Sequence, residues 1–189
     1  MQVSGQGIGK AALWCAMMAL VLGSAVAAAD EAALPATQTD AVPVETPERG
    51  PVTNLPLPRF VSLKGSEGNA RRGPSLSHRI DWIFQHNGMP LKITAEYGNW
   101  RRVEDSEGAG GWVHYSLLSG VRSVTVTVES LDLRVRADPG APVVAQAEQG
   151  AIARLGECFT DWCRISVPGV QGWAPKSALW GVSADELRD

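Results

Sequence analysis

Hydrophobic and polar residues alternate with a period of two in short stretches of the second part of the chain. Residues 91–96 read Leu-Lys-Ile-Thr-Ala-Glu, and residues 124–128 read Val-Thr-Val-Thr-Val. Such alternation, rich in β-branched residues, predicts strands with one buried face. Turn signals built from Gly, Pro and Asn interrupt the pattern roughly every six to ten residues, and no segment shows a long helical period. The pattern therefore predicts an all-β fold of short strands.

The same part of the chain contains an internal repeat. Residues 97–103 read Tyr-Gly-Asn-Trp-Arg-Arg-Val, and residues 159–165 read Phe-Thr-Asp-Trp-Cys-Arg-Ile. Both runs have an aromatic residue, two turn residues, Trp, one variable residue, Arg and a β-branched residue. A Gly-Trp-x-x-x-Ser-x-Leu run follows in each copy, at 111–118 and at 172–179. The second part of the chain therefore consists of two related copies.

Further matches define where the two copies begin and end. The run at 69–74 is aligned with the run at 134–139, because both end in Pro, and Gly88 is aligned with Gly150. These alignments predict a first copy at 59–121 and a second copy at 122–183, followed by a tail at 184–189. About sixty residues in five or six short strands can close only a small β-barrel or a cramped sandwich.

The quoted motifs resemble the bacterial Src-homology-3-like domains found in exported proteins, including a subgroup common in proteobacteria. The resemblance implies two small Src-homology-3-like β-barrels in tandem. It also implies binding or interaction modules, which often stand beside cell-wall hydrolases or help to attach a protein to peptidoglycan. Because repeated aromatic residues are usually structural, we expect the four aligned tryptophans to pack in the barrel cores; they are Trp100, Trp112, Trp162 and Trp173.

The N-terminal residues have the pattern of a secretory signal peptide. Lys10 is the only charged residue before Asp30, the stretch from 11 to 29 is apolar or small throughout, and residues 25–27 read Ala-Val-Ala. We predict a signal peptide at 1–27, removed on export, and a periplasmic location. The alternative is an uncleaved N-terminal helix that anchors the protein, since the apolar run is long enough to span a membrane.

Residues 28–58 differ in composition from the two copies. This stretch holds half of the twelve prolines, together with Ala, Thr, Glu and Val in no periodic order. Proline removes hydrogen-bond donors and favours extended chain, so we predict a disordered linker here. The linker would hold the folded part away from its attachment or neighbours.

Charge and cysteine content narrow the class of partner. Once residues 1–27 are removed, 16 basic and 20 acidic residues remain, a net charge of −4. A mildly acidic protein is a poor candidate for nucleic acid or anionic polymers. Cys158 and Cys163 then form an even pair in an exported chain, which predicts a disulfide. The alternatives are two free thiols or half of a metal site that lacks its other ligands.

We find no pattern typical of an enzyme. The sequence has no His-Glu-x-x-His run and no Gly-x-Ser-x-Gly run. The three histidines, His78, His86 and His114, have no spacing that sets metal ligands on one element. Cys158 as a nucleophile would need a partner His positioned by a larger catalytic domain. We therefore expect a protein that is not an enzyme and that uses no cofactor and no metal.

The resemblance implies a ligand groove between the first long loop and the following hairpin loop, lined by aromatic residues. In the first copy we expect the groove at Arg72, His78, Asp81 and Trp82, with Tyr115 closing it. Trp82 and Tyr115 have no aromatic counterpart in the second copy, which favours them as ligand contacts. The predicted partner is peptidoglycan or a cell-wall peptide; the alternative is a protein-interaction adaptor for an envelope enzyme or complex. The sequence carries no signal for the oligomeric state.

Overall fold

The computed structural model describes residues 48–189. The predicted signal peptide at 1–27 and the predicted linker up to residue 47 lie outside the described residues. Within residues 48–189, no helix is long and apolar enough to cross a membrane. The described chain consists of strands joined by turns and two short 3-10 helices.

The first copy folds into one seven-stranded antiparallel sheet with the order β5-β4-β8-β7-β6-β3-β9. A single turn of 3-10 helix, η1, follows β8. The elements of this copy are β3 (Arg59–Leu63), β4 (Gly68–Arg71), β5 (Ile80–Phe84), β6 (Pro90–Tyr97), β7 (Trp100–Glu104), β8 (Gly110–His114), η1 (Tyr115–Leu117) and β9 (Leu118–Ser119).

The second copy repeats this topology strand for strand, with the order β12-β11-β15-β14-β13-β10-β16. Its 3-10 helix, η2, stands at the place of η1. The elements of this copy are β10 (Ser123–Val126), β11 (Ser130–Arg134), β12 (Val143–Glu148), β13 (Ile152–Cys158), β14 (Trp162–Val167), β15 (Val170–Pro175), η2 (Lys176–Ala178) and β16 (Leu179–Trp180).

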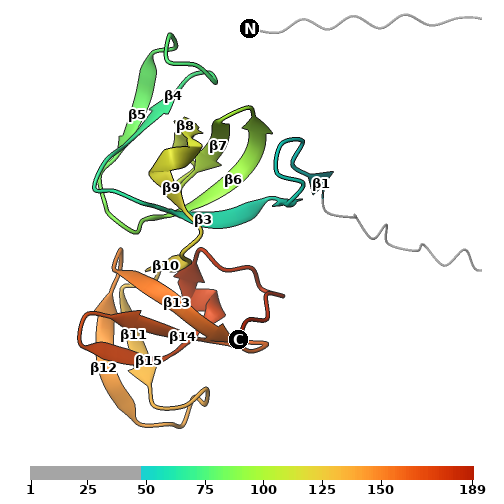
Figure 1. The fold of residues 1–189 in the computed structure, drawn as a ribbon. Coiled ribbons are helices and arrows are strands. Elements are labelled where there is room, and N and C mark those ends of the chain that lie inside the picture. The colour runs from blue at the N-terminus through green and yellow to red at the C-terminus, as the bar shows by residue number, and fades with distance from the viewer. Residues whose placement is uncertain (1–47) are drawn as a thin grey trace, which may run out of the picture. The chain divides into compact units, whose positions relative to one another are not determined.

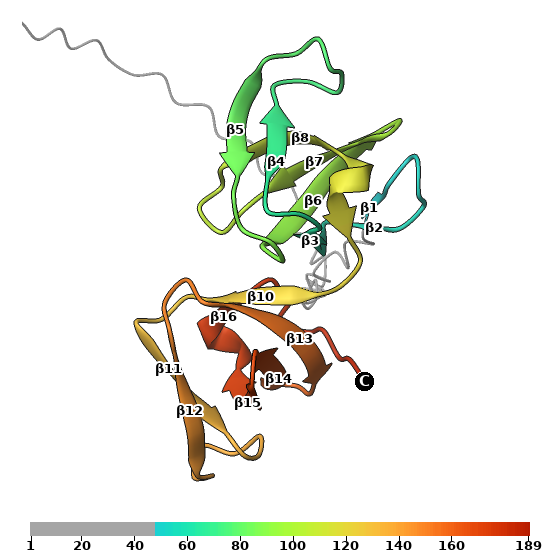
Figure 2. The same cartoon turned by 60° about the vertical axis from the view of Figure 1, so that its left-hand side comes forward.

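Figures 1 and 2 show each sheet curling around its own interior. The tandem all-β prediction is confirmed. Among the described residues, however, no strand pairing joins the two end strands of either sheet. Each copy is therefore a strongly curved open sheet, and the hydrogen-bonded ladder does not close into a complete barrel.

The two cores contain aliphatic side chains, one Phe and, in the second copy, Cys158 and Cys163, and they contain no Trp. Leu63, Phe84 and Leu91 are buried in the first copy, and Leu133 and Ile165 in the second. The expectation that four tryptophans fill the cores is wrong, because all four are only partly buried. Strand alternation gives the reason: the residues that point inward are Val103 and Ile165, three places after Trp100 and Trp162, so each Trp faces the opposite way.

The strand register corrects the alignment of the run at 69–74 with the run at 134–139. Arg71 lies opposite Trp112, and Arg134 lies opposite Trp173. Arg134 therefore corresponds to Arg71 and not to Asn69. The two arginines also form equivalent hydrogen bonds to the long loop that follows each of them. Arg71 donates to the carbonyl of His78 at 2.7 Å, and Arg134 donates to the carbonyl of Ala141 at 2.7 Å.

The corrected register shows that a small and a large core residue have changed places between two paired strands from one copy to the other. In the first copy Gly68 lies opposite Phe84, whereas in the second Leu131 lies opposite Ala147. One small and one large residue fill the space in both cases, on opposite strands. Close packing requires the summed volume to be kept, and this arrangement keeps it although neither residue is the same in the two copies.

Residues 48–58, which we predicted as the end of the disordered linker, are folded. The strands β1 (Glu48–Arg49) and β2 (Pro56–Leu57) pair as a small antiparallel hairpin. Its turn is fixed to the first copy, because the amides of Val52 and Thr53 donate to the Glu96 carboxylate at 3.1 and 2.9 Å. Composition alone did not reveal this, because the contact depends on a carboxylate more than forty residues away.

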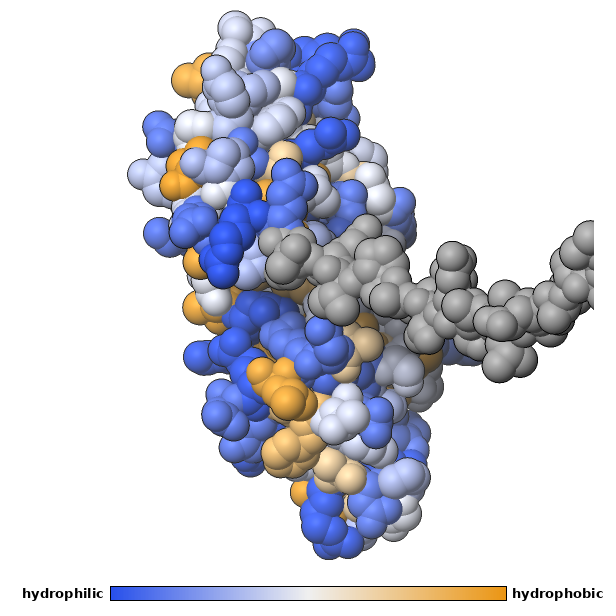
Figure 3. Space-filling view, turned by 90° about the vertical axis from the view of Figure 1, so that its right-hand side faces the viewer, coloured by the Kyte–Doolittle hydropathy of each residue, from blue (hydrophilic) through white to orange (hydrophobic). Residues whose placement is uncertain are grey.

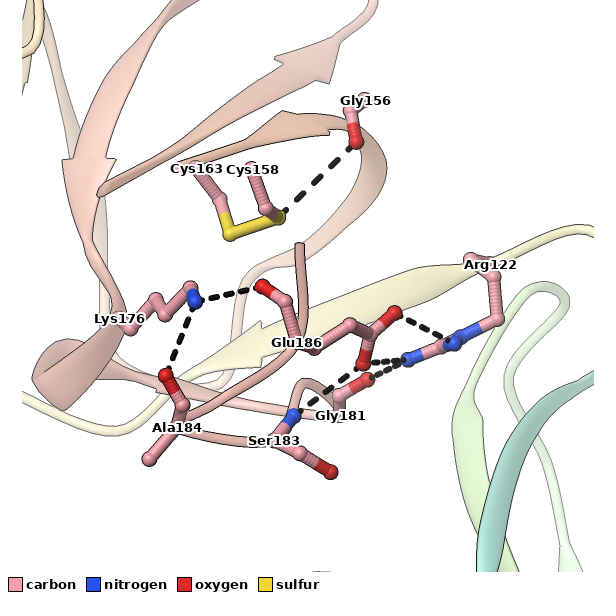
Figure 4. The surroundings of a disulfide bond; sticks show 9 residues. All are labelled: Arg122, Gly156, Cys158, Cys163, Lys176, Gly181, Ser183, Ala184 and Glu186. Atoms are coloured by element: carbon pink, nitrogen blue, oxygen red, sulfur yellow. Dashed lines mark hydrogen bonds and ion pairs between the residues drawn. A yellow bond between two sulfur atoms is a disulfide. The ribbon is translucent and has the colours of Figure 1, made fainter. Parts of the chain in front are cut away.

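The C-terminal residues are likewise fixed to the second copy (Figure 4). Cys158 and Arg188 exchange backbone hydrogen bonds of 2.7 and 3.1 Å. Arg122 forms an ion pair with Glu186 at 2.8 Å and donates to the carbonyl of Gly181 at 2.7 Å. The segment predicted as a tail is thus part of the folded second copy.

The predicted disulfide joins Cys158 to Cys163 across the β13–β14 hairpin. Such a short loop constrains the unfolded chain little, so we predict that the Cys158→Ala, Cys163→Ala double variant loses about 2 kcal/mol of unfolding free energy. Urea denaturation with and without a reducing agent checks this. A reduced wild type should match the double variant, and complete unfolding on reduction would contradict the prediction.

Candidate ligand-binding surfaces

One tryptophan stands at the same hairpin end in each copy. Trp100 begins β7 and lies opposite His114, and Trp162 begins β14 and lies opposite Pro175. In each copy the first residue of the 3-10 helix donates a backbone hydrogen bond to the residue before the Trp. The amide of Tyr115 donates to the carbonyl of Asn99 at 2.9 Å, and the amide of Lys176 donates to the carbonyl of Asp161 at 2.8 Å. The hairpin end and the 3-10 helix are therefore fixed side by side, with a partly exposed indole between them.

In the first copy this place holds an aromatic cluster of Trp100, His114 and Tyr115. The His114 ring meets Trp100 edge-on at 5.5 Å between ring centroids and meets Tyr115 at 4.9 Å. Tyr115 is about half exposed, and His114 is further held by Ser116, whose Oγ lies 2.7 Å from Nδ1. Rings held in this way offer a rigid aromatic contact surface at little cost in side-chain entropy.

In the second copy the equivalent place is a groove, which we call the Trp162 groove. Trp162 and Pro175 form a wall shared by two hollows of about 460 and 440 Å³. The first hollow is also lined by Asp161, Lys176 and Ser177. The second hollow extends from this wall to residues of β11 and its following loop; these are Ser130, Leu131, Asp132, Arg134 and Pro139.

Some charged groups in the Trp162 groove are already bound by the protein, and one is exposed to a ligand. Lys176 is buried, and its ammonium donates to the carbonyls of Ala184 at 3.0 Å and Glu186 at 2.6 Å (Figure 4). Arg134 is engaged by Asp132 and by the Ala141 carbonyl. Asp161 is exposed. The groove thus presents a partly exposed indole, a proline and a carboxylate to the solvent.

The β6–β7 hairpin of the first copy and the β13–β14 hairpin of the second carry different stabilising cross-strand pairs at the same position. In the first copy Glu96 lies opposite Arg101, and in the second Cys158 lies opposite Cys163. An ion pair, 3.6 Å between Arg101 Nε and Glu96 Oε1, therefore replaces the disulfide. Both devices lie directly beside the turn that carries the Trp, and both hold its position.

The environment of Glu96 changes the acidity of its carboxyl group. Burial by itself would raise the pKa, but hydrogen bonds from the Thr53 hydroxyl and amide, from Arg59 and from the Val52 amide outweigh it and lower the pKa to about 2. The carboxylate side chain is fully buried, and Arg59 approaches it at 2.6 Å. The charged form of Glu96 is thus strongly preferred in the folded protein.

This acidity predicts how stability depends on pH. A carboxyl group with a lowered pKa contributes stability above its unfolded value of 4.5, and the contribution is lost as the pH falls from 4.5 toward 2. The loss is on the order of 3 kcal/mol. Thermal melts between pH 7 and 2 on the wild type and on Glu96→Gln check this. Glu96→Gln should show a shallower pH dependence, and an identical slope in both proteins would contradict the prediction.

The structure brings some of the predicted groove residues together and separates others. Arg72 pairs with Asp81 at 2.9 Å, with Arg79 added on the other oxygen at 2.6 Å. The hydrogen bond from Arg72 has the largest effect on the pKa of Asp81, and together with Arg79 it lowers that pKa. The ring of His78 lies over Gly73, where a Cβ would overlap it. These residues share the β4–β5 hairpin and its loop.

Trp82 and Tyr115, the two aromatic residues we expected to share a groove, lie in different clusters. Trp82 is on the end strand β5, where it lines an open hollow with the exposed side chains of Ile80 and Ile83. Tyr115 belongs to the cluster of Trp100 and His114. Within residues 48–189, no ring contact, hydrogen bond or ion pair joins Tyr115 to Trp82. Figure 3 shows hydrophobic side chains reaching the surface at several separate places on one face.

Sequence reasoning missed the Trp162 groove. Its residues come from five separate segments, and Trp162 was assigned to the core. The alternation around Trp162 was a usable signal, because Cys163 and Ile165 are the inward positions of that strand. Nothing in the sequence indicated that Lys176 turns inward, since it stands where the first copy has the exposed Tyr115.

The fold of each copy, with its curved antiparallel sheet and its 3-10 helix before the last strand, is that of a small Src-homology-3-like domain. The profile of the bacterial SH3 domain family matches twice, at residues 64–120 and 127–181. The two matches cover more than half of the chain. This protein therefore belongs to the bacterial SH3 domain family.

One similar protein is named "Putative N-acetylmuramoyl-L-alanine amidase YrvJ", from Bacillus subtilis (strain 168). It is 30% identical over 141 residues, which cover 64% of this chain and 27% of that protein. This chain thus spans about a quarter of the length of that relative.

Among solved structures, similarity is found to two proteins of Trichomonas vaginalis, NlpC1 and NlpC2. The TM-scores are 0.32 and 0.31, at 13% identity in both cases. The matches cover 69% and 65% of this chain, and 48% of each of those chains. Similarity this slight carries no argument about fold or function.

Proposed function

We propose that this protein is an exported binding module that recognises the peptide part of the bacterial cell wall and performs no chemistry of its own. Src-homology-3-like domains bind extended peptides along aromatic-lined grooves. The observation that carries the proposal is the Trp162 groove, in which an indole and a proline separate two hollows. A ligand lying across that wall would contact both hollows, as an extended peptide does.

The placement of the tryptophans supports a binding role. The chain has seven, of which Trp14 lies outside the described residues, and each of the other six is at least partly exposed. A partly exposed Trp leaves apolar area in water, which a ligand can cover. The similarity to a protein named as an N-acetylmuramoyl-L-alanine amidase favours a ligand in the cell wall.

Sedimentation of the purified protein with purified peptidoglycan sacculi, at low and high salt, tests the proposal. We expect binding that persists at high salt, because groove recognition through apolar contacts is screened less than charge attraction. Soluble muropeptides measured in the supernatant serve as the control for catalysis. Absence of sedimentation above that of an unrelated protein contradicts the binding function, and release of muropeptides contradicts the non-catalytic role.

A second candidate function is an adaptor for an envelope enzyme or complex, and the end strand β5 favours it. Ile80, Trp82 and Ile83 are each more than 40% exposed, and β5 has a neighbouring strand on one side only. A partner can add a strand to such an edge. Crosslinking in cells that yields one stoichiometric protein partner, lost in Trp82→Ala, would favour the adaptor over the wall-binding module.

A periplasmic location is part of the proposal and rests on the N-terminal sequence pattern. Mass spectrometry of the native N-terminus tests it. A chain that starts at Ala28 or Asp30 means that the signal peptide is removed, whereas a chain that retains residues 1–27 means that the N-terminal segment stays as an anchor.

A further inference from the structure

The Trp162 groove presents one charge that the protein itself leaves available. Asp161 is exposed in the first hollow and directly precedes Trp162 in the chain. Among residues 48–189, no hydrogen bond or ion pair engages its carboxylate, although its backbone carbonyl accepts from the amide of Lys176 at 2.8 Å. The carboxylate is therefore free to meet a charge that a ligand brings.

The two basic side chains that line the groove, Lys176 and Arg134, are already engaged. Lys176 is only 8% exposed, and its ammonium is directed to the carbonyls of Ala184 and Glu186 (Figure 4). Glu186 in turn directs its carboxylate to Arg122. In the second hollow, Arg134 is held by Asp132 and a backbone carbonyl. The exposed charge at the first hollow is therefore negative.

An indole beside a carboxylate matches a specific ligand chemistry. A cation is attracted to the face of a Trp ring and forms a charge-assisted hydrogen bond with a carboxylate. The disulfide Cys158–Cys163 closes the loop that carries Asp161 and Trp162, which holds the two side chains at one hairpin end. We propose that the Trp162 groove binds a ligand with a primary ammonium group next to an apolar body, with Asp161 as its counter-ion.

This inference rests on the proposed function and narrows it to a wall peptide that has a free amino group. It also predicts that the two copies differ in the ligand group that they bind. The position of Asp161 is occupied by Asn99 in the first copy, and the position of Lys176 by Tyr115. The first copy therefore has no carboxylate at this place, and the proposal assigns the ammonium group to the second copy alone.

The test uses the purified full chain and two preparations of sacculi, one untreated and one with its amino groups acetylated. The variant Asp161→Asn removes the charge and keeps the shape, and it reproduces the residue of the first copy. Glu129→Gln is the matched control, because it removes one exposed acid of the second copy that lines neither hollow. Thermal melts confirm that both variants are folded.

On untreated sacculi we expect Asp161→Asn to bind about tenfold more weakly than the wild type, and Glu129→Gln to bind like the wild type. On acetylated sacculi the wild type should bind as weakly as Asp161→Asn, because their difference depends on the amino group. Binding of Asp161→Asn equal to that of Glu129→Gln, or no effect of acetylation, overturns the inference alone. Failure of the wild type to bind untreated sacculi overturns the proposed function, and the inference with it.

Discussion

Replacing Glu96 by alanine is expected to destabilise the first copy by roughly 3–5 kcal/mol. The buried carboxylate accepts from the amides of Val52 and Thr53 and from the Thr53 hydroxyl, and it pairs with Arg59 and Arg101. The variant leaves two largely buried guanidinium groups without a counter-charge, which costs more than the loss of the contacts alone. It also releases the β1–β2 hairpin. Urea denaturation followed by Trp fluorescence measures the change.

The control for Glu96→Ala is Glu104→Ala. Glu104 pairs with Lys92 on the surface, and both side chains are about one third exposed. A solvated pair of this kind contributes at most about 1 kcal/mol. If Glu96→Ala were as stable as Glu104→Ala, the buried carboxylate would not hold the N-terminal hairpin, and our account of residues 48–58 would be wrong.

Replacing Trp162 by alanine is expected to weaken binding to sacculi by roughly 10–100-fold. The indole lines both hollows of the groove, so its removal merges them and takes away the largest apolar contact. The strand interior should tolerate the change, because the core positions of β14 are Cys163 and Ile165. Sedimentation with sacculi measures the affinity, and a thermal melt checks the fold.

The comparison variant for Trp162→Ala is Trp82→Ala, which makes the same truncation on the surface of β5. Trp82 is the more exposed of the two, and it is one of the two aromatic residues that the sequence favoured as ligand contacts. We expect Trp82→Ala to bind sacculi within about twofold of the wild type, since surface truncations outside a contact are usually near neutral. Loss of binding in Trp82→Ala and not in Trp162→Ala would move the site to the β5 surface.

Much of the fold could be predicted because it depends on local signals. Alternation at 91–96 and at 124–128 predicted strands, and β6 and β10 lie there. Gly88 and Gly150, aligned with each other, adopt φ values of 74° and 81°, which favour glycine and fix equivalent turns. The even cysteine pair predicted the disulfide correctly.

The misassigned tryptophans and the missed groove have physical causes of a different kind. The tryptophans were assigned to the core by residue type, although strand alternation places them on the outer face. The unmatched aromatic residues pointed to the first copy, where the predicted groove stays a prediction; the Trp162 groove was missed because it is assembled from segments near residues 132, 139, 162 and 175. Spacing along the chain does not bring such segments together; only the register of the folded sheet does.

The central claim is that the Trp162 groove contacts the wall peptide. An NMR titration of the ¹⁵N-labelled protein with soluble muropeptides released from sacculi tests it most directly, because each Trp indole gives its own signal. We predict that the Trp162 indole signal, assigned by its absence in Trp162→Ala, shifts and saturates as muropeptide is added. A Trp162 signal that stays in place while other signals shift and saturate, or a spectrum in which no signal moves, would contradict it.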